Sequence, residues 1–204
     1  MSDVIHVPGG RHVVGSLDAS DADAVVVACP PHPQHGGSRS DPRLRAVGDA
    51  LGPDVACLRI DYGPWDEGHG ERVDAENALA WAADSYDAVG LFGYSFGAAV
   101  ALWAAAEFRD DNPDSLRACS VLAPPAGLSA DRETVDAVGN IGCPLQVVYG
   151  ERDETVAWEP VVERARERGG TVESVTAGHQ FAGERDAVAD LVASFLRAHL
   201  VSKR

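Results

Sequence analysis

The sequence predicts an α/β fold in which a mostly parallel sheet, doubly wound, is covered by helices on both faces. Short continuous apolar runs alternate with amphipathic or alanine-rich segments along the 204 residues. Apolar runs of this kind are typical of strands that are buried on both faces. Their alternation with helices favours a parallel sheet, which binds ligands at the carboxyl ends of its strands.

The elements follow from local signals, taken in order. Residues 4–17 alternate around a Pro-Gly-Gly turn and predict a hairpin at an antiparallel edge of the sheet. The predicted strands are Ala24–Cys29, Val55–Ile60, Ala88–Phe92, Ala118–Ala123, Pro144–Tyr149 and Thr171–Thr176. The predicted helices are Pro42–Leu51, Val73–Ala83, Phe96–Phe108, Glu159–Arg168 and Ala187–His199. Asp41 as N-cap and Pro42 at the first helical position mark the start of the first helix.

The organisation of the chain predicts one domain over residues 1–204, because no linker, repeat or low-complexity segment interrupts it. No stretch approaches the roughly 20 apolar residues of a membrane span. The first residues, MSDVIHVPGG, lack the basic and apolar regions of a secretory signal. We therefore expect a soluble cytoplasmic protein.

The charge balance is strongly acidic, with 32 Asp and Glu against 17 Lys and Arg and a formal net charge of −15. Lys203 is the only lysine. This acidity argues against nucleic acid and anionic membrane as partners. It favours a halophilic surface, on which carboxylates stay hydrated and salt screens their repulsion. The alternative is an acidic protein from a GC-rich genome in which Arg replaces Lys.

The cysteines do not indicate a metal site, because no CxxC pair or Cys/His spacing typical of zinc is present. All four lie at or near apolar runs and are predicted to be buried core thiols: Cys29, Cys57, Cys119 and Cys143. The acidic cluster Asp110, Asp111 and Asp114 is interpreted as a solvated surface. We expect neither a metal nor a cofactor.

Ser95 is the candidate nucleophile, because it lies in Gly93-Tyr-Ser-Phe-Gly97 between a predicted strand and an alanine-rich helix. This G-x-S-x-G pattern forms a nucleophile elbow, whose turn is so sharp that glycine is needed two residues to either side. The turn holds the hydroxyl clear of the sheet. The alternative is a small residue in a plain strand–helix turn.

A serine hydroxyl needs a histidine to accept its proton and an acid to orient that histidine. In such elbows the chain order is Ser, then Asp or Glu, then His. Asp153 lies in the loop after the strand Pro144–Tyr149, and His179 lies in the loop directly after the strand Thr171–Thr176. Glu151 and Glu154 are alternative acids that we expect to face solvent or to cap the following helix.

The oxyanion hole is predicted to use the backbone N–H of Phe96, at the start of the helix after Ser95. A second donor should come from the loop CPPHPQHGG, residues 29–37, after an earlier strand. Proline removes the N–H at positions 30, 31 and 33, which leaves those of His32 and Gln34. His32 is favoured by its register, and Gln34 is the alternative.

These segments resemble the α/β-hydrolase superfamily, and more narrowly its small dienelactone-hydrolase-like and carboxylesterase-like members. The resemblance covers most of the chain and rests on PPHPQHGG, RIDYGPWDEGHGERVDAENAL, GLFGYSFGAAVAL, YGERDETV and AGHQFAGERDAVADLVASFL. It implies hydrolysis of an ester-type bond through an acyl-enzyme on Ser95. The chain departs from the family by carrying serine where dienelactone hydrolases proper carry cysteine. It also has Pro30 where relatives often have His, and Asp61-Tyr-Gly63 where they often have Phe-Arg-Gly.

The predicted substrate is a small acyl compound in an open site. Only residues 124–143 separate the strand after the elbow helix from the strand that precedes Asp153, so no large cap domain fits there. The residues expected to contact substrate are Tyr94, Gln34, Trp65 and Trp158, with Phe96 and Phe181 nearby. Thioester, amide or peptide hydrolysis is an alternative within the same chemistry, and a non-catalytic scaffold used for binding is an alternative outside it.

Overall fold

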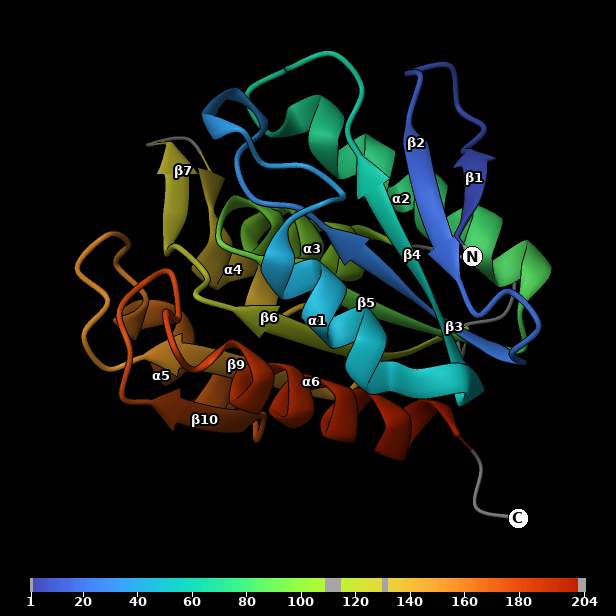
Figure 1. The fold of residues 1–204 in the computed structure, drawn as a ribbon. Coiled ribbons are helices and arrows are strands. Elements are labelled where there is room, and N and C mark those ends of the chain that lie inside the picture. The colour runs from blue at the N-terminus through green and yellow to red at the C-terminus, as the bar shows by residue number, and fades with distance from the viewer. Residues whose placement is uncertain (1, 109–114, 130–131, 202–204) are drawn as a thin grey trace.

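An eight-stranded sheet forms the centre of the computed structural model, which describes residues 2–108, 115–129 and 132–201 (Figure 1). The acidic cluster Asp110, Asp111 and Asp114 therefore lies outside the described residues. The sheet has the order β1-β2-β4-β3-β5-β6-β9-β10. Its strands are β1 (Asp3–His6), β2 (Val14–Asp18), β3 (Ala24–Cys29), β4 (Val55–Asp61), β5 (Ala88–Tyr94), β6 (Leu116–Leu122), β9 (Leu145–Gly150) and β10 (Thr171–Val175).

The sheet is parallel from β4 to β10, whereas β1 and β2 run antiparallel at one edge. The predicted hairpin over residues 4–17 is thus confirmed as an antiparallel edge. The strands β3, β5, β6 and β9 lie side by side in the middle of the sheet. Because they are parallel, the loops that follow them emerge at the same edge.

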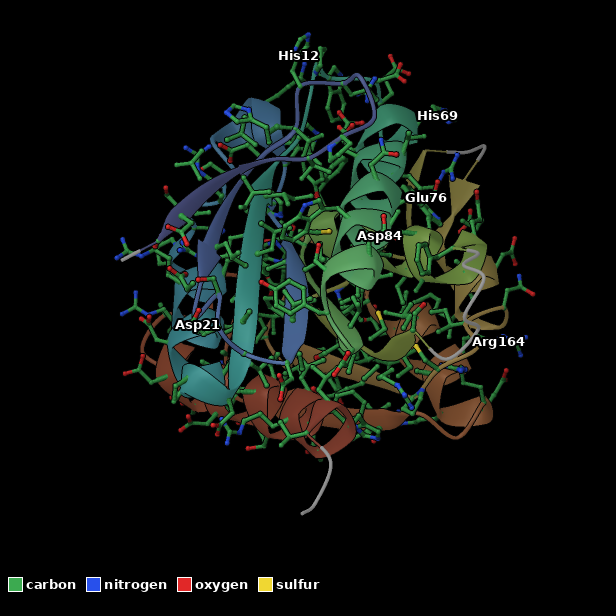
Figure 2. The ribbon with its side chains drawn as sticks, turned by 90° about the vertical axis from the view of Figure 1, so that its right-hand side faces the viewer. His12, Asp21, His69, Glu76, Asp84 and Arg164 are labelled. Atoms are coloured by element: carbon green, nitrogen blue, oxygen red, sulfur yellow. The ribbon has the colours of Figure 1, made fainter. Side chains whose placement is uncertain are left out.

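Helices cover both faces of the sheet, which confirms the predicted α/β class (Figure 1). One face carries α2 (His69–Ser85), α3 (Phe96–Glu107), α4 (Thr134–Val138) and α5 (Glu159–Glu167), whose apolar side chains share one core cluster. The other face carries α1 (Pro42–Leu51) and α6 (Arg185–Leu200), which pack into a second cluster. Figure 2 shows α2 lying along the sheet, with Glu76 and Asp84 on it.

The start of α1 agrees with the prediction, because the Asp41 carboxylate accepts a hydrogen bond of 2.8 Å from the Arg43 N–H. The start of α2 does not, since the helix begins at His69 rather than at Val73. The buried Glu71 carboxylate accepts the N–H of Gly68 at 2.8 Å and that of Asp66 at 3.0 Å. These hydrogen bonds stabilise a helical turn in a stretch whose glycines had indicated a loop.

The segment between β6 and β9 holds only short described elements: the helix α4, the loop stretches around it, and the strand pair β7 (Gly127–Ser129) and β8 (Arg132–Glu133). The sequence did not predict this strand pair. A cap domain is absent from the described part of this segment, as expected. Among the described helices, none is long and apolar enough to cross a bilayer.

The four cysteines are buried and unpaired, which confirms them as core thiols. Burial raises the pKa of the Cys29 and Cys57 thiols to about 12. Both groups therefore stay protonated, as small apolar side chains do in a core.

Gly97 allows α3 to lie directly against the end of β3. A Cβ atom at this position would lie 2.2 Å from the Cys29 carbonyl oxygen and 2.4 Å from that of Pro30. Both neighbours are backbone atoms, so a side chain could be accommodated only by moving the helix away from the sheet. The absence of a side chain at Gly97 therefore allows the start of α3 to lie next to the loop after β3.

The substitution Gly97→Ala should lower the free energy of unfolding by about 2 kcal/mol or more, because overpacking against backbone cannot be relieved by a rotamer change. Chemical denaturation measures this change. Gly142→Ala is the matched control, because a Cβ there meets nothing within 4 Å. Equal stability of the two variants would contradict the proposed contact.

Candidate active site

Ser95 occupies the sharp turn between β5 and α3 with φ 56° and ψ −119°, a left-handed conformation that non-glycine residues rarely adopt. Gly93 permits the turn, because a Cβ there would lie 2.1 Å from the Gly97 carbonyl oxygen. The Ser95 N–H donates to the Leu122 carbonyl at 2.9 Å, which ties the turn to β6. The backbone therefore presents the hydroxyl above the sheet edge, as an elbow requires.

Ser95, His179 and Asp153 form one continuous hydrogen-bonded chain. The Ser95 Oγ lies 2.9 Å from His179 Nε2, and His179 Nδ1 lies 2.8 Å from Asp153 Oδ2. The residues come from the loops after β5, β9 and β10. His179 and Asp153 are both buried, at 9% and 7% exposure. The structure thus brings together the three residues that the sequence singled out.

The loop after β9 fixes the Asp153 carboxylate. The Thr155 N–H donates to Asp153 Oδ1 at 2.9 Å, which leaves Oδ2 for His179. The Trp158 indole N–H donates to the Asp153 carbonyl at 3.3 Å, and its ring stacks on Tyr149 with centroids 4.1 Å apart. Both contacts restrict the loop, so the orientation of the acid is set before any substrate arrives.

The loops that carry Asp153 and His179 are packed against each other. A Cβ at Gly150 would lie 2.5 Å from the Ala177 carbonyl oxygen. The Arg152 N–H donates to that same carbonyl at 3.0 Å. The separation of the acid and the histidine is therefore fixed by backbone contacts as well as by their own hydrogen bond.

This arrangement suits proton transfer from the serine. A carboxylate that accepts from Nδ1–H leaves Nε2 free to accept the Ser95 proton, and it stabilises the imidazolium that results. The alternative acid Glu151 lies elsewhere, since its carboxylate accepts the hydroxyls of Ser174 at 3.0 Å and Thr176 at 2.8 Å. These hydrogen bonds lower the pKa of Glu151. Glu154 is exposed.

A pocket of about 310 Å³ opens beside the Ser95 hydroxyl. Among the described residues, those that line it are Pro31, His32, His35, Gly36, Gly37, Asp41, Arg43, Tyr94, Ser95, Thr155, His179 and Gln180. The loop after β3 forms one wall, and the start of α1 with the His179 loop forms another. The nucleophile therefore faces a small open cleft.

An aromatic cluster adjoins this pocket at the loop after β3. The His32 ring stacks on His35 at 4.4 Å and lies 4.6 Å from Trp65 and 4.9 Å from Phe96, all measured between ring centroids. Burial, together with the neighbouring His35, lowers the pKa of His32. The neutral imidazole is therefore favoured, as its packing among rings requires.

Of the two residues predicted to supply the oxyanion hole, Phe96 directly follows Ser95 and His32 lines the pocket beside it. Phe96 is the first residue of α3, so its N–H has no intrahelical acceptor. Within the described residues, the His32 N–H donates to no protein acceptor.

The four residues predicted to contact substrate do not all lie at the pocket. Tyr94 lines the pocket, whereas Gln34, Trp65 and Trp158 are not among its described lining residues. Gln34 is exposed on the 3-10 turn of Pro33–His35. Trp65 packs against His32 and stays 36% exposed, while Trp158 holds the Asp153 loop. Phe181 is fully buried in the core below the His179 loop.

Asp41, Arg43 and Gln180 line the pocket, although the sequence did not indicate them as site residues. Arg43 carried one local signal. It lies in the first turn of α1, where the helix dipole disfavours a cation. Such a placement suggests a tertiary role, but the sequence does not show which partner the side chain reaches.

His32 and His35 line the pocket beside Ser95, whereas His12, His69 and His199 are not among its described lining residues. Figure 2 shows His12 and His69 pointing outward at one end of the molecule. His199 lies in the last turn of α6, where its Nδ1 bonds the Phe195 carbonyl at 2.8 Å. Among the described residues, no group of three or more His, Cys, Asp or Glu side chains is arranged to hold a metal ion.

Comparison with known proteins identifies the fold of this chain. Neither protein-family models nor curated protein sequences match the chain. Among solved structures, it is similar to Est1E from Butyrivibrio proteoclasticus, at 18% identity and TM-score 0.79 over 97% of this chain and 98% of that one. It is similar to a dienelactone hydrolase from Anabaena variabilis, at 24% identity and TM-score 0.76 over 98% of each chain. It is also similar to an alpha-beta serine hydrolase homologue from Coxiella burnetii, at 24% identity and TM-score 0.78 over 96% and 97%. The chain therefore has the α/β-hydrolase fold.

Proposed function

We propose that this protein is a serine hydrolase of carboxylesterase type that cleaves a small-molecule ester through an acyl-enzyme on Ser95. The observation that carries the proposal is the unbroken hydrogen-bonded chain from the Ser95 hydroxyl through His179 to Asp153. The dienelactone hydrolase and the alpha-beta serine hydrolase homologue among the similar structures support hydrolase chemistry on this fold.

In the proposed reaction, Ser95 Oγ attacks the ester carbonyl carbon while His179 Nε2 accepts the hydroxyl proton. The resulting oxyanion is stabilised by the N–H groups of Phe96 and His32. When the bond to the alcohol breaks, His179 returns the proton to the leaving oxygen. Water then attacks the acyl-enzyme with His179 as base, and this releases the acid and restores Ser95.

The pocket supports a small acyl group. Its volume of about 310 Å³ lies at the lower end of ligand pockets, which span roughly 300–1,000 Å³. The described residues between β6 and β9 include no cap that could enclose a long chain. The substrate is thus proposed to carry a short acyl chain, with its remaining part exposed to solvent.

Ser95→Ala should abolish labelling by a fluorophosphonate probe and lower ester hydrolysis by about 10³-fold or more, because it removes the hydroxyl that forms the acyl-enzyme. Circular dichroism should show an unchanged fold. Ser40→Ala, which removes an exposed hydroxyl on another loop, is the matched control and should retain full activity. Full turnover by Ser95→Ala would falsify the proposed function and favour a binding scaffold.

Asp153→Asn should lower kcat by roughly 10³–10⁴-fold and leave KM nearly unchanged, because an amide donor favours the tautomer whose Nε2 already carries a proton. Steady-state kinetics with an activated ester measures both parameters. Glu151→Gln is the control, since this exposed acid lies two residues away. A larger loss from Glu151→Gln than from Asp153→Asn would contradict the choice of acid.

A panel of p-nitrophenyl esters from acetate to laurate should give its highest kcat/KM for the short chains and fall steadily from octanoate onwards. Running the panel at low and high salt also tests the acidic surface, since added salt screens repulsion between carboxylates and should raise stability and activity. A preference for laurate would contradict the proposed substrate size. Full stability without added salt would argue against adaptation to high salt.

A further inference from the structure

We propose that Arg43 is a positioning residue, whose guanidinium holds the segment that carries His179 in place against the elbow. This inference rests on the proposed function, since it concerns the same site. Arg43 comes from the start of α1, 137 positions away along the chain from Gln180, the residue that it contacts beside His179. The link therefore joins two elements that are remote in sequence.

The first contact holds the residue that follows the base. Arg43 Nη1 donates to the Gln180 side-chain oxygen at 2.8 Å and approaches its backbone carbonyl at 3.4 Å. A charged donor that reaches both the side chain and the backbone of one residue restricts its position more than a single bond would. The segment after His179 is thus held from the side of α1.

The second contact runs through Tyr94, the neighbour of the nucleophile. Its hydroxyl donates to the His179 carbonyl at 3.0 Å, and the Arg43 guanidinium lies 4.4 Å from the centre of its ring. Burial raises the pKa of Tyr94 to about 12, so the hydroxyl keeps its proton at any working pH. Arg43 therefore covers the ring whose hydroxyl holds the backbone of the base.

Asp41 orients Arg43 in turn. The Arg43 Nε donates to Asp41 Oδ1 at 2.9 Å, and Nη2 forms an ion pair with Oδ2. Asp41 is also the N-cap of α1 and is 8% exposed. Burial acts to lower the pKa of Arg43, but the hydrogen bond that Arg43 donates to Asp41, together with the electrostatic contributions of Tyr94 and Asp41, outweighs burial and raises the pKa, so the charge is kept. This carboxylate also offsets the unfavourable placement of a cation in the first helical turn.

An arginine in a hydrolase pocket could instead bind an anionic group of the substrate. The contacts oppose that role here, because Nε and Nη2 are engaged by Asp41 and Nη1 is engaged by Gln180. The charge is neutralised by the adjacent carboxylate. The guanidinium therefore acts on the protein rather than on a ligand.

The expected consequence concerns the rate of the chemical step. Asp153 and Ser95 contact only the His179 ring. The backbone of the His179 segment is held by the Arg152 N–H at Ala177 on one side of the histidine, and by Tyr94 and Arg43 at His179 and Gln180. Without Arg43, the ring should sample positions in which Nε2 is too far from Oγ. A displacement of about 1 Å in a catalytic group can cost up to 10²-fold in rate.

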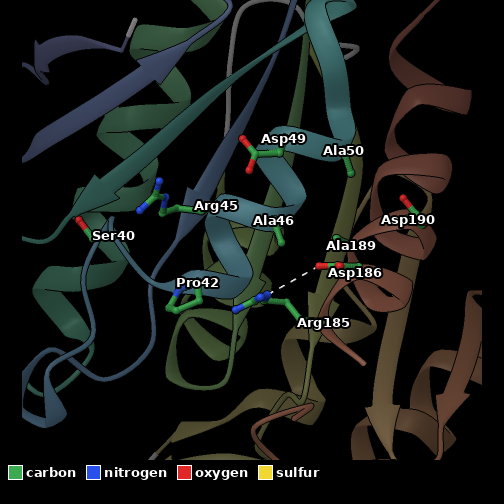
Figure 3. Close-up of a pocket in the computed structure, with 10 residues that line it drawn as sticks. All are labelled: Ser40, Pro42, Arg45, Ala46, Asp49, Ala50, Arg185, Asp186, Ala189 and Asp190. Atoms are coloured by element: carbon green, nitrogen blue, oxygen red, sulfur yellow. Dashed lines mark ion pairs between the residues drawn. The ribbon is translucent and has the colours of Figure 1, made fainter. Parts of the chain in front are cut away.

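The test compares Arg43→Ala with Arg45→Ala. Arg45 lies on the same helix, is exposed, and lines a separate pocket beside α6 (Figure 3). Arg43→Ala should lower kcat on a short neutral ester by about 10- to 100-fold with little change in KM. Arg45→Ala should match the wild type, and Arg43→Lys should recover part of kcat because it retains a cation near Gln180 and Tyr94.

A second variant changes the other side chain of the contact between Arg43 and Gln180. Gln180→Ala removes the partner without altering the start of α1, so it is informative even where Arg43→Ala is poorly folded. Because Gln180 acts only through its contact with Arg43 in this proposal, the double variant should lose little more than Arg43→Ala alone. Additive losses would overturn the proposal. A loss that appears in KM, and only for esters that carry a carboxylate, would also overturn it and assign Arg43 to anion binding.

A spectroscopic measurement separates this proposal from the proposed function. The Nδ1–H proton of His179, observed by NMR with labelled histidine, should be sharp in the wild type and in Arg45→Ala. It should broaden or shift in Arg43→Ala at equal melting temperature. An unchanged signal would overturn the positioning role. If the wild type hydrolyses no ester and resists fluorophosphonate, the proposed function fails, whereas the NMR comparison still decides the role of Arg43.

Discussion

The turn at Ser95 is the constraint on which the rest of the site depends. A non-glycine residue is held at φ 56°, and the glycines on either side have no room for a Cβ. Strain of this kind persists only where the surroundings fix it. Here the bond from Ser95 to β6 and the seating of α3 against β3 supply that restraint. The position of the hydroxyl thus follows from packing of the whole central sheet.

The parallel sheet brings segments that are far apart in the sequence together in one site. β5, β9 and β10 end at the same edge, so the loops after them bring serine, acid and histidine together without a long connection. This is why the triad could be predicted from sequence. Ser95 and Asp153 lie just after apolar runs and His179 lies in the loop after a short alternating strand, each recognisable by itself, and the parallel arrangement brings the three loops to one edge. The boundaries of α1 and β3 were predictable for the same local reasons.

What the sequence could not supply depends on contacts between distant side chains. The early start of α2 requires the buried Glu71 carboxylate to satisfy the N–H groups of a glycine-rich turn. Trp158 resembled a substrate contact by its position, yet its stacking on Tyr149 turns it toward the Asp153 loop. Arg43 reaches its partner across most of the chain. Local patterns carry no information about such pairings.

The close seating of Gly97 on the Cys29 and Pro30 carbonyls has a consequence for modularity. The loop after β3, which bears His32, and the elbow that bears Ser95 are packed so closely that neither can be replaced without adjusting the other. A loop taken from another hydrolase would have to bring carbonyls that fit the same glycine. Diversification of this scaffold is therefore easier at the His35 and Trp65 rim, where side chains remain exposed to solvent, than at the base of the loop.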